Sequence, residues 1–221
     1  MIIGIAGPIN AGKDTFGNLL CGALGNLSSV TVDSFAAPIR QIAQYLGFRL
    51  EREHKEQTVC RIFPCFEEEL HKAIEEHLGG LPDNTKAELF ARTVEVLRNG
   101  HYLRSGMFDD TLAISPRKFM QLFGTEAGLT CNSNLWIEML HQRTAGYDRV
   151  IITDVRFIKE ANYCDYLIYM VRDLSDLPTD HVSEADHHEL ILRSDLRVYN
   201  YGSYGDLAAV ATDLAKELVR G

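Results

Sequence analysis

The stretch IIGIAGPINAGKDT, residues 2–15, decides the fold of this 221-residue chain. Residues 2–6 form an apolar run of strand length, and the residues that follow position 15 have the apolar spacing of a helix. Between them, Gly7 and the pair Gly12-Lys13 have the Gly-x4-Gly-Lys spacing of a phosphate-binding loop. Such a loop points backbone N–H groups at a polyphosphate, while the helix N-terminus and the lysine add positive charge. The sequence therefore predicts binding of a nucleoside triphosphate.

The loop differs from the common nucleotide-hydrolase form, in which Ser or Thr directly follows the lysine and ligates Mg²⁺. Here Asp14 follows Lys13 and the hydroxyl comes one place later, at Thr15. A threonine delayed in this way resembles the loop of small nucleotide kinases. A glycine turn that merely joins strand to helix is the alternative, but the strand–loop–helix context favours phosphate binding. The predicted ATP-binding residues are Gly7, Asn10, Ala11, Gly12, Lys13, Asp14 and Thr15.

Composition limits the other possibilities. Hydrophobic residues make up 46% of the chain, enough for the core of one domain, and the net charge of −9 argues against binding to a nucleic-acid backbone. The five cysteines are scattered and lack zinc-site spacing, which indicates free thiols in a reducing compartment. The first strand leaves no room for a signal peptide, and no apolar run approaches the ~20 residues of a membrane span. We expect a cytoplasmic protein.

The two ends of the chain have the pattern of an α/β sheet. Continuous apolar runs at 150–153 and 166–171 are typical of central parallel strands covered on both faces. Further strands are predicted at 2–6, 30–33 and 196–199, and helices after the loop and at 38–46, 135–143 and 206–219. Ser115-Pro116 has the N-cap and N1 pattern of another helix start. We predict a P-loop NTPase-type three-layer sandwich with a mostly parallel central sheet.

The middle of the chain, about 49–107, has charge-rich helical patterns that no strand pattern interrupts. Apolar stripes lie on either side of a break at 79–84. We interpret residues 1–221 as a single P-loop kinase domain in which this helical insert forms a substrate or lid region.

Three other segments carry candidate site residues. Asp154 and Arg156 follow a buried strand, at the edge where open α/β sheets bind ligands. There Asp154 could hold Mg²⁺ and Arg156 could bind phosphate. Alternatively, the pair could merely cap the strand and a helix. Arg117 and Lys118 place two cations in the first turn of a helix, where a bound anion would offset the dipole, although solvated surface charge is nearly as plausible. The third segment, 33–40, contains Asp33, Phe35 and Arg40. Arg40 could bind a substrate phosphate, and Phe35 could either flank a base or pack in the core.

Together these residues resemble the bacteriophage deoxynucleoside monophosphate kinases, which are related in fold to adenylate kinase. The resemblance runs nearly end to end. It rests on segments 12–15, 34–38, 117–126, 152–157 with 160–161, 180–184 and 200–203, and on Trp136. One departure concerns the acceptor side, because the family leads us to expect an arginine soon after Gly124-Thr125-Glu126, where this chain has Leu129.

The resemblance implies transfer of the γ-phosphate of ATP, with Mg²⁺, to a deoxynucleoside 5′-monophosphate, in the host cytoplasm if a phage encodes the enzyme. The loop and Lys13 would bind the β- and γ-phosphates, and Thr15 would help hold the metal. Asp154 would either help hold the metal or act as a carboxylate on the acceptor side, and Asp14 is a weaker candidate. Arg40, Arg117 and Arg156 would clamp the acceptor phosphate and the group in transfer, since a planar fork binds phosphate in a way that lysine does not. The expected substrate-binding residues are Asp33, Phe35, Arg40, Arg117, Gln121, Thr125, Glu126 and Trp136.

Other functions share the loop. A regulatory GTPase would need an Asp-x-x-Gly switch after a later strand and an Asn-Lys-x-Asp base-reading motif. The chain has no Asn-Lys-x-Asp motif, and its Asp-x-x-Gly match at 14–17 directly follows the loop lysine, at the start of the predicted helix. A kinase of another small phosphorylated acceptor, such as phosphomevalonate, shares the Gly-Lys-Asp form and is the main alternative. A nucleotide-binding protein without catalysis is the third. The expected partners are ATP and a deoxynucleoside monophosphate, with no nucleic acid or membrane, and a homodimer is possible.

Overall fold

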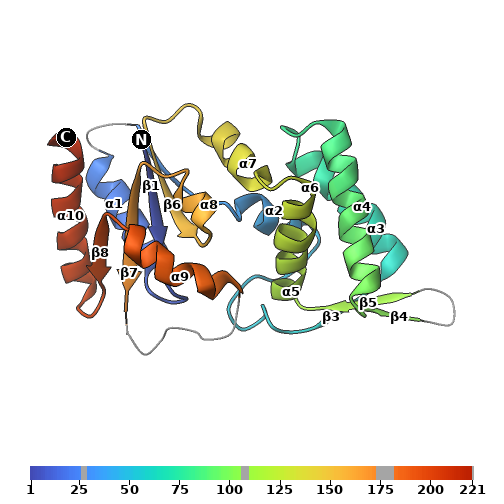
Figure 1. Ribbon diagram of the computed structural model, residues 1–221. Coiled ribbons are helices and arrows are strands. Elements are labelled where there is room, and N and C mark those ends of the chain that lie inside the picture. The colour runs from blue at the N-terminus through green and yellow to red at the C-terminus, as the bar shows by residue number, and fades with distance from the viewer. Residues whose placement is uncertain (26–28, 106–109, 173–181, 221) are drawn as a thin grey trace. The chain divides into compact units, whose positions relative to one another are not determined.

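The computed structural model describes residues 1–25, 29–105, 110–172 and 182–220, which divide into two compact units (Figure 1). The first unit comprises Met1–Phe35 and Arg143–Gly221, and the second comprises Ala36–Gln142. The chain therefore leaves the first unit once, forms the second, and returns.

A five-stranded sheet in the order β2-β6-β1-β7-β8 forms the centre of the first unit. The strands are β1 (Ile2–Ala6), β2 (Val30–Asp33), β6 (Arg149–Val155), β7 (Tyr166–Val171) and β8 (Leu196–Tyr199). All neighbouring pairs are parallel, so the carboxyl ends of the five strands lie along one edge. This confirms the predicted fold class and the five predicted strands.

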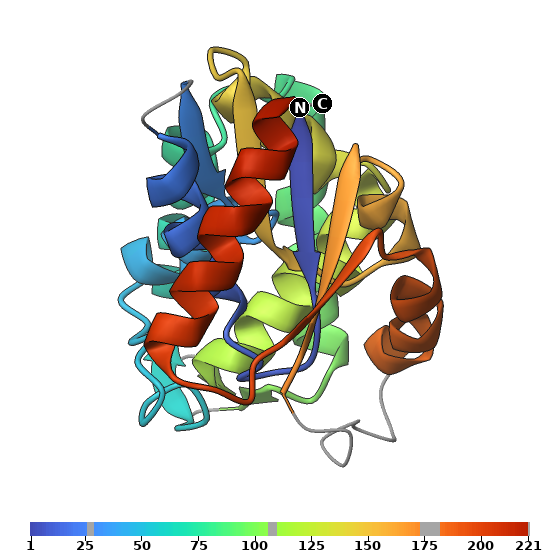
Figure 2. The same ribbon diagram turned by 90° about the vertical axis from the view of Figure 1, so that its left-hand side faces the viewer.

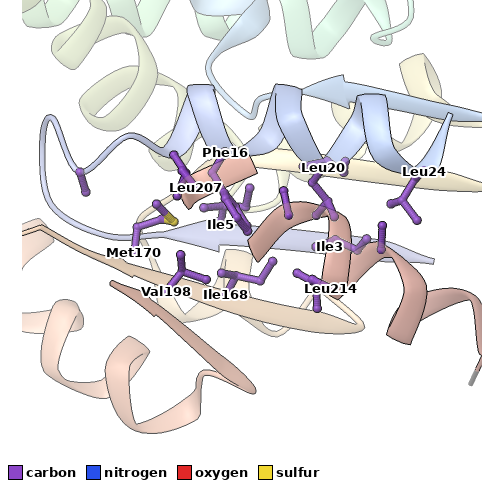
Figure 3. Close-up of a cluster of buried hydrophobic side chains, with 14 residues drawn as sticks. Ile3, Ile5, Phe16, Leu20, Leu24, Ile168, Met170, Val198, Leu207 and Leu214 are labelled. Atoms are coloured by element: carbon purple, nitrogen blue, oxygen red, sulfur yellow. The ribbon is translucent and has the colours of Figure 1, made fainter. Parts of the chain in front are cut away.

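Helices cover both faces of this sheet, as Figure 2 shows. On one face, α1 (Lys13–Leu24) and α10 (Tyr204–Arg220) pack on a core that includes Ile3 and Ile5 (Figure 3). Alternate residues of a strand point to opposite faces, and Gly4, between those two, faces Cys164, which follows α8 (Ile158–Ala161). A Cβ at residue 4 would lie 2.4 Å from the Cys164 sulfur, so only glycine fits there. Helix α9 (Val182–Arg193) packs near α8 and β7.

The second unit is mainly helical but contains a small antiparallel sheet in the order β3-β5-β4. Its elements are α2 (Ala37–Tyr45), β3 (Val59–Ile62), α3 (Phe63–His77), α4 (Asp83–Asn99), β4 (Leu103–Arg104), β5 (Thr111–Ile114), α5 (Pro116–Gln121), the π-helix η1 (Leu122–Gly128), α6 (Leu129–Cys131) and most of α7 (Leu135–Thr144). The helix start predicted at Ser115 is confirmed, because its hydroxyl accepts the Lys118 N–H at 3.3 Å.

The prediction that no strand interrupts residues 49–107 is wrong, because β3 and β4 lie within that range. Strand β3 has only four residues, two of them exposed, and β4 has only two. Segments this short bury too little apolar surface to leave a strand pattern in the sequence. Aromatic rings in stacked and edge-on contacts form part of this unit's core, among them Phe48, Phe66, Phe119 and Phe123.

Candidate active site

The loop between β1 and α1 has a backbone that requires its glycines. Gly7 has φ 139° and Gly12 has φ 92°, in a region that side chains rarely adopt. A Cβ at residue 7 would lie 2.5 Å from the carbonyl oxygen of Met170. Asn10 also has a positive φ, 64°, which asparagine tolerates better than most residues. Three of the six residues between Ala6 and Lys13 therefore turn the chain sharply at the end of the strand.

Helix α1 begins directly after this turn and leaves its first N–H groups available to a ligand. Gly12 is the N-cap and has no side chain to satisfy them. The N–H of Phe16 donates to the Gly12 carbonyl at 2.9 Å, whereas the N–H groups of the preceding turn have no intrahelical acceptor. Free N–H groups and the positive end of the helix dipole together attract an anion.

The Lys13 side chain lies across the loop. Its Nζ donates to the carbonyl oxygens of Gly7 and Pro8, each at 2.8 Å. Burial and the nearby Arg156 guanidinium lower the pKa of Lys13 to about 8, while the Asp14 and Asp154 carboxylates act in the opposite direction. The charges that act on Lys13 show that the loop, Asp154 and Arg156 gather at one edge of the sheet.

Asp14 and Thr15 differ in their surroundings. The Asp14 carboxylate accepts a hydrogen bond from the Thr153 hydroxyl on β6 at 2.6 Å, which ties the start of α1 to the sheet. Thr15 is exposed in the first turn of α1. Asp14 is exposed as well, so the two residues after the lysine differ in that the Asp14 carboxylate already accepts a hydrogen bond from the sheet.

Asp154 lies within β6, one residue before the strand ends, and not just past its end as predicted. It is buried, and its Oδ1 accepts the Phe35 N–H at 2.8 Å. The Phe35 ring is also buried and packs edge-on against Tyr163, with ring centroids 6.5 Å apart. Those contacts match the core-packing alternative for Phe35, and its role in flanking a base stays a prediction.

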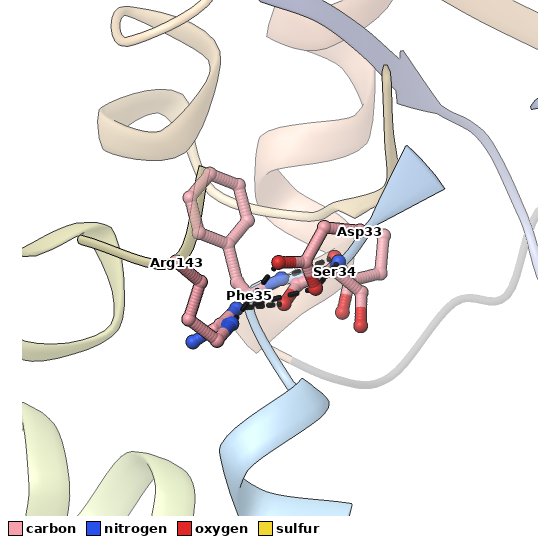
Figure 4. Close-up of polar contacts among 5 residues, drawn as sticks. Asp33, Ser34, Phe35 and Arg143 are labelled. Carbon is pink, nitrogen blue, oxygen red and sulfur yellow. Dashed lines mark hydrogen bonds and ion pairs between the residues drawn. The ribbon is translucent and has the colours of Figure 1, made fainter. Parts of the chain in front are cut away.

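Asp33, at the end of β2, forms an ion pair with Arg143 (Figure 4). The Arg143 Nε donates to Asp33 Oδ2 at 3.0 Å, and Nη2 donates to Asp33 Oδ1 at 3.3 Å and to the Ser34 carbonyl at 3.0 Å. This bidentate pair links two positions at the boundary of the first unit. Asp33 lies shortly before the chain leaves that unit, and Arg143 is the residue at which the chain returns to it.

The turn after β6 is held by Glu160. Its carboxylate accepts the N–H groups of Arg156 at 2.7 Å and Phe157 at 3.1 Å. Burial and the nearby Asp154 carboxylate raise the pKa of Glu160 to about 7, against the opposing effects of the two N–H donors and the Arg156 guanidinium. The Arg156 side chain is exposed. A fixed backbone therefore carries a cation at the edge where the phosphate loop lies.

Comparison with known proteins decides the family. Residues 55–210 match the family model described as deoxynucleotide monophosphate kinase, which is more than half of the chain. The chain belongs to that family. The matched region begins after the phosphate loop, so the loop geometry and the family match are separate observations that agree.

The kinase is also 27% identical, over 91% of its length and 95% of the relative's, to the deoxynucleoside-5′-monophosphate kinase of Escherichia phage T5. Among solved structures, shikimate kinase from Aquifex aeolicus matches with 10% identity and a TM-score of 0.37 over all of both chains, a score too low to support any conclusion. Family membership makes the chain an enzyme that transfers a phosphoryl group to a deoxynucleoside monophosphate. This excludes the phosphomevalonate alternative.

The acceptor-side residues predicted in the second unit lie on different elements. Arg117, in α5, is exposed and forms an ion pair with Glu56. Gln121 ends α5, and Thr125 and Glu126 are exposed in the π-helix η1, a kind of turn that often marks functional sites. Their substrate contacts stay predictions.

Trp136 and Arg40 also belong to the second unit. The Trp136 ring is buried, its Nε1 donates to the Gly124 carbonyl at 2.7 Å, and its edge would lie 2.6 Å from a Cβ at Gly128. The ring therefore holds the π-helix in place, and a substrate contact for it stays a prediction. Arg40 lies in the first turn of α2 and is partly exposed.

Three residues of the first unit had no predicted role. They are Arg143, Arg172, whose Nη1 donates to the Asn10 carbonyl at 2.8 Å, and Asn200, whose Nδ2 donates to the Ala11 carbonyl at 3.0 Å. Arg172 and Asn200 directly follow β7 and β8, so the strand-end rule that selected Asp154 would have selected them too. Segment 180–184, part of the family resemblance, lies partly outside the described residues.

Within the described ranges, no group of three or more His, Cys, Asp or Glu residues is arranged to hold a metal ion. Nor does any helix in these ranges combine the length and apolar character that crossing a membrane requires.

Proposed function

We propose that the phosphate donor is ATP with Mg²⁺, and that the loop and Lys13 bind its β- and γ-phosphates. The observation that carries this is the turn at Gly7–Gly12, whose free helix N–H groups lie beside Lys13, Asp154 and Arg156 at the carboxyl edge of the sheet. Lys13 Nζ would exchange the carbonyls of Gly7 and Pro8 for phosphate oxygens and neutralise their charge.

The residues present fit a magnesium ion. Mg²⁺ prefers oxygen ligands and keeps several waters. The exposed Thr15 hydroxyl and the Asp154 carboxylate supply such oxygens, Thr15 as a direct ligand and Asp154 through water. When bound, the ion would neutralise charge on the phosphates. Asp14 is the weaker candidate because its carboxylate already accepts the Thr153 hydroxyl.

On the acceptor side, Arg156 would bind the group in transfer, and Arg40 and Arg117 would bind the acceptor phosphate. The acceptor 5′-phosphate is already anionic, so transfer needs alignment and charge neutralisation more than a general base. Gln121, Thr125, Glu126 and Trp136 are the proposed substrate-binding residues of the second unit, with Asp33 and Phe35 from the first. In the single-domain interpretation, part of the insert closes to exclude water. A homodimer and a location in host cytoplasm stay predictions.

Acceptor-dependent ADP release tests this proposal. ADP would be measured with ATP and Mg²⁺ alone, then with dGMP, dTMP, dCMP or dAMP. We expect slow release alone and fast release with at least one acceptor, because acceptor binding completes the arginine clamp. Fast hydrolysis that no nucleotide alters would contradict the proposal.

The matched variant is Lys13→Ala, which should lose most activity while keeping the wild-type circular dichroism spectrum. Wild-type turnover in Lys13→Ala would show that the loop does not bind the donor phosphates as proposed.

A further inference from the structure

Asn200, directly after β8, makes two hydrogen bonds, one to the end of β7 and one to the phosphate loop. Its backbone N–H donates to the Val171 carbonyl at 2.7 Å, which continues the pairing of β8 with β7. Its side-chain Nδ2 donates to the carbonyl oxygen of Ala11 at 3.0 Å, 189 residues earlier in the chain. The backbone bond fixes the place of residue 200, so the side chain is free to act on the loop.

That contact determines how the Ala11–Gly12 peptide is turned. The described backbone has no cis peptides, and in a trans peptide the C=O and N–H groups point in opposite directions. With the Ala11 carbonyl held by Asn200, the Gly12 N–H points the other way, and none of the described residues accepts it. Because glycine populates positive and negative φ about equally, the Ala11–Gly12 peptide can flip unless something holds it.

A second carbonyl of the loop is held in the same manner. The Nη1 of Arg172, just after β7, donates to the Asn10 carbonyl at 2.8 Å. Consecutive carbonyls at Asn10 and Ala11 are thus bound by side chains from the ends of the two strands next to β1 on that side. A loop that must present N–H groups to an anion needs its carbonyls turned away from that anion.

We propose that Asn200 is a positioning residue of the donor site, which holds the Ala11 carbonyl and so directs the Gly12 N–H toward the donor phosphates. The inference rests on the proposed role of the loop in binding those phosphates. Asn200 itself need not touch ATP. Its loss would allow the Ala11 carbonyl to face the phosphates, where the two groups repel.

The test compares Asn200→Ala with Asn162→Ala. Asn162 is a matched control in the same unit, because its Oδ1 accepts a hydrogen bond from Arg193 and not from the loop. Both substitutions are neutral, so neither adds charge near the phosphates. Asn200→Leu, which keeps the volume but has no donor, serves if the alanine variant is unstable. Binding of ATP and of inorganic tripolyphosphate would be measured by calorimetry, alongside the KM of each substrate, kcat and Tm.

We expect Asn200→Ala to weaken both ATP and tripolyphosphate by about tenfold, the upper range for one hydrogen bond. The KM of the deoxynucleoside monophosphate should stay within about twofold of wild type, because Asn200 acts on the donor loop alone. General damage to the site would raise this KM as well. Asn162→Ala should bind all ligands as wild type does.

Three outcomes separate the inference from the proposal beneath it. If Lys13→Ala loses tripolyphosphate binding but Asn200→Ala and Asn200→Leu keep it, the inference is wrong and the loop proposal stands. If Lys13→Ala also binds tripolyphosphate as wild type does, the proposed role of the loop fails, and the inference fails with it. If the acceptor KM rises as much as the ATP KM in the Asn200 variants, their effect is general damage and the inference is overturned.

Discussion

Raising the pH above 8 should reduce the kinase's efficiency with ATP, because Lys13 loses the proton that gives it charge. Burial and the Arg156 guanidinium lower the pKa of Lys13 from 10.5 to about 8. With that pKa, about nine-tenths of the molecules carry a charged Lys13 at pH 7 and about one-tenth at pH 9. If only the charged form binds the donor phosphates productively, kcat/KM for ATP should fall about tenfold over this interval.

Steady-state kinetics at saturating acceptor would measure this fall. The quantity to follow is kcat/KM for ATP, since it reports the pKa of Lys13 in the enzyme before ATP binds, whereas bound phosphate raises the pKa of the lysine. The matched variant is Lys13→Arg, because a guanidinium stays protonated across the range. Its absolute rate can be low, but its profile between pH 7 and 9 should be flat.

Unfolding at high pH would not mimic this result. The pKa of Lys13 is lower in the folded chain than in the unfolded chain, so the unfolded chain binds more protons between about pH 8 and 10.5. This residue therefore makes the folded state more stable as the pH rises through that window, while activity falls. A kcat/KM for ATP that stays constant from pH 7 to 9, or an equal fall in Lys13→Arg, would refute the assignment of this pKa to donor binding.

Three further predictions concern neighbouring residues. Arg156→Lys and Arg117→Lys should each lower kcat severalfold although the charge is kept, because the planar guanidinium is lost. If both lysine variants have the wild-type kcat, the proposed arginine clamp is wrong. Glu160→Gln should raise Tm more at pH 8 than at pH 5. The folded chain raises the pKa of Glu160 from 4.5 to about 7, so the wild-type protein loses stability as the pH rises through this window. Glutamine has no proton to lose there and avoids that loss. Equal shifts at both pH values would contradict that. Asp154→Asn should raise the Mg²⁺ concentration for half-maximal activity, and an unchanged requirement would remove Asp154 from the metal site.

The central sheet could be predicted from the sequence because its strands are continuous apolar runs. Residues 166–171 are mostly buried, and only a strand covered on both faces needs such a run. The antiparallel sheet of the second unit leaves no comparable pattern. In β3 the side chains alternate between exposed and partly buried, over four residues only, and Arg61 in its middle pairs with Glu69. Local composition there resembles the charged helices around it.

The candidate site was predictable to the extent that it follows strand ends. The loop after β1 was found by its glycine–lysine spacing at a strand end, and Asp154 and Arg156 were found by their position at the end of the strand that is β6. Arg143 could not be, because it comes from the end of a helix and meets Asp33 across 110 residues of chain. No pattern in the sequence relates a helix-terminal arginine to a strand-end aspartate so far away, since their contact depends on where the second unit begins and ends.

The order of the strands explains why the loop is held from several sides. Strand β1 lies at the centre of the sheet, between β6 and β7, and β8 follows β7. Every residue that directly follows one of these parallel strands lies at the same edge as the loop. Arg172 and Asn200 after β7 and β8 hold two loop carbonyls, while Thr153 of β6 holds Asp14 on the other side. The loop has few side chains of its own with which to fix its shape. Because β1 is central, the strands on both sides of it can supply the hydrogen-bond donors that fix the loop and the start of α1.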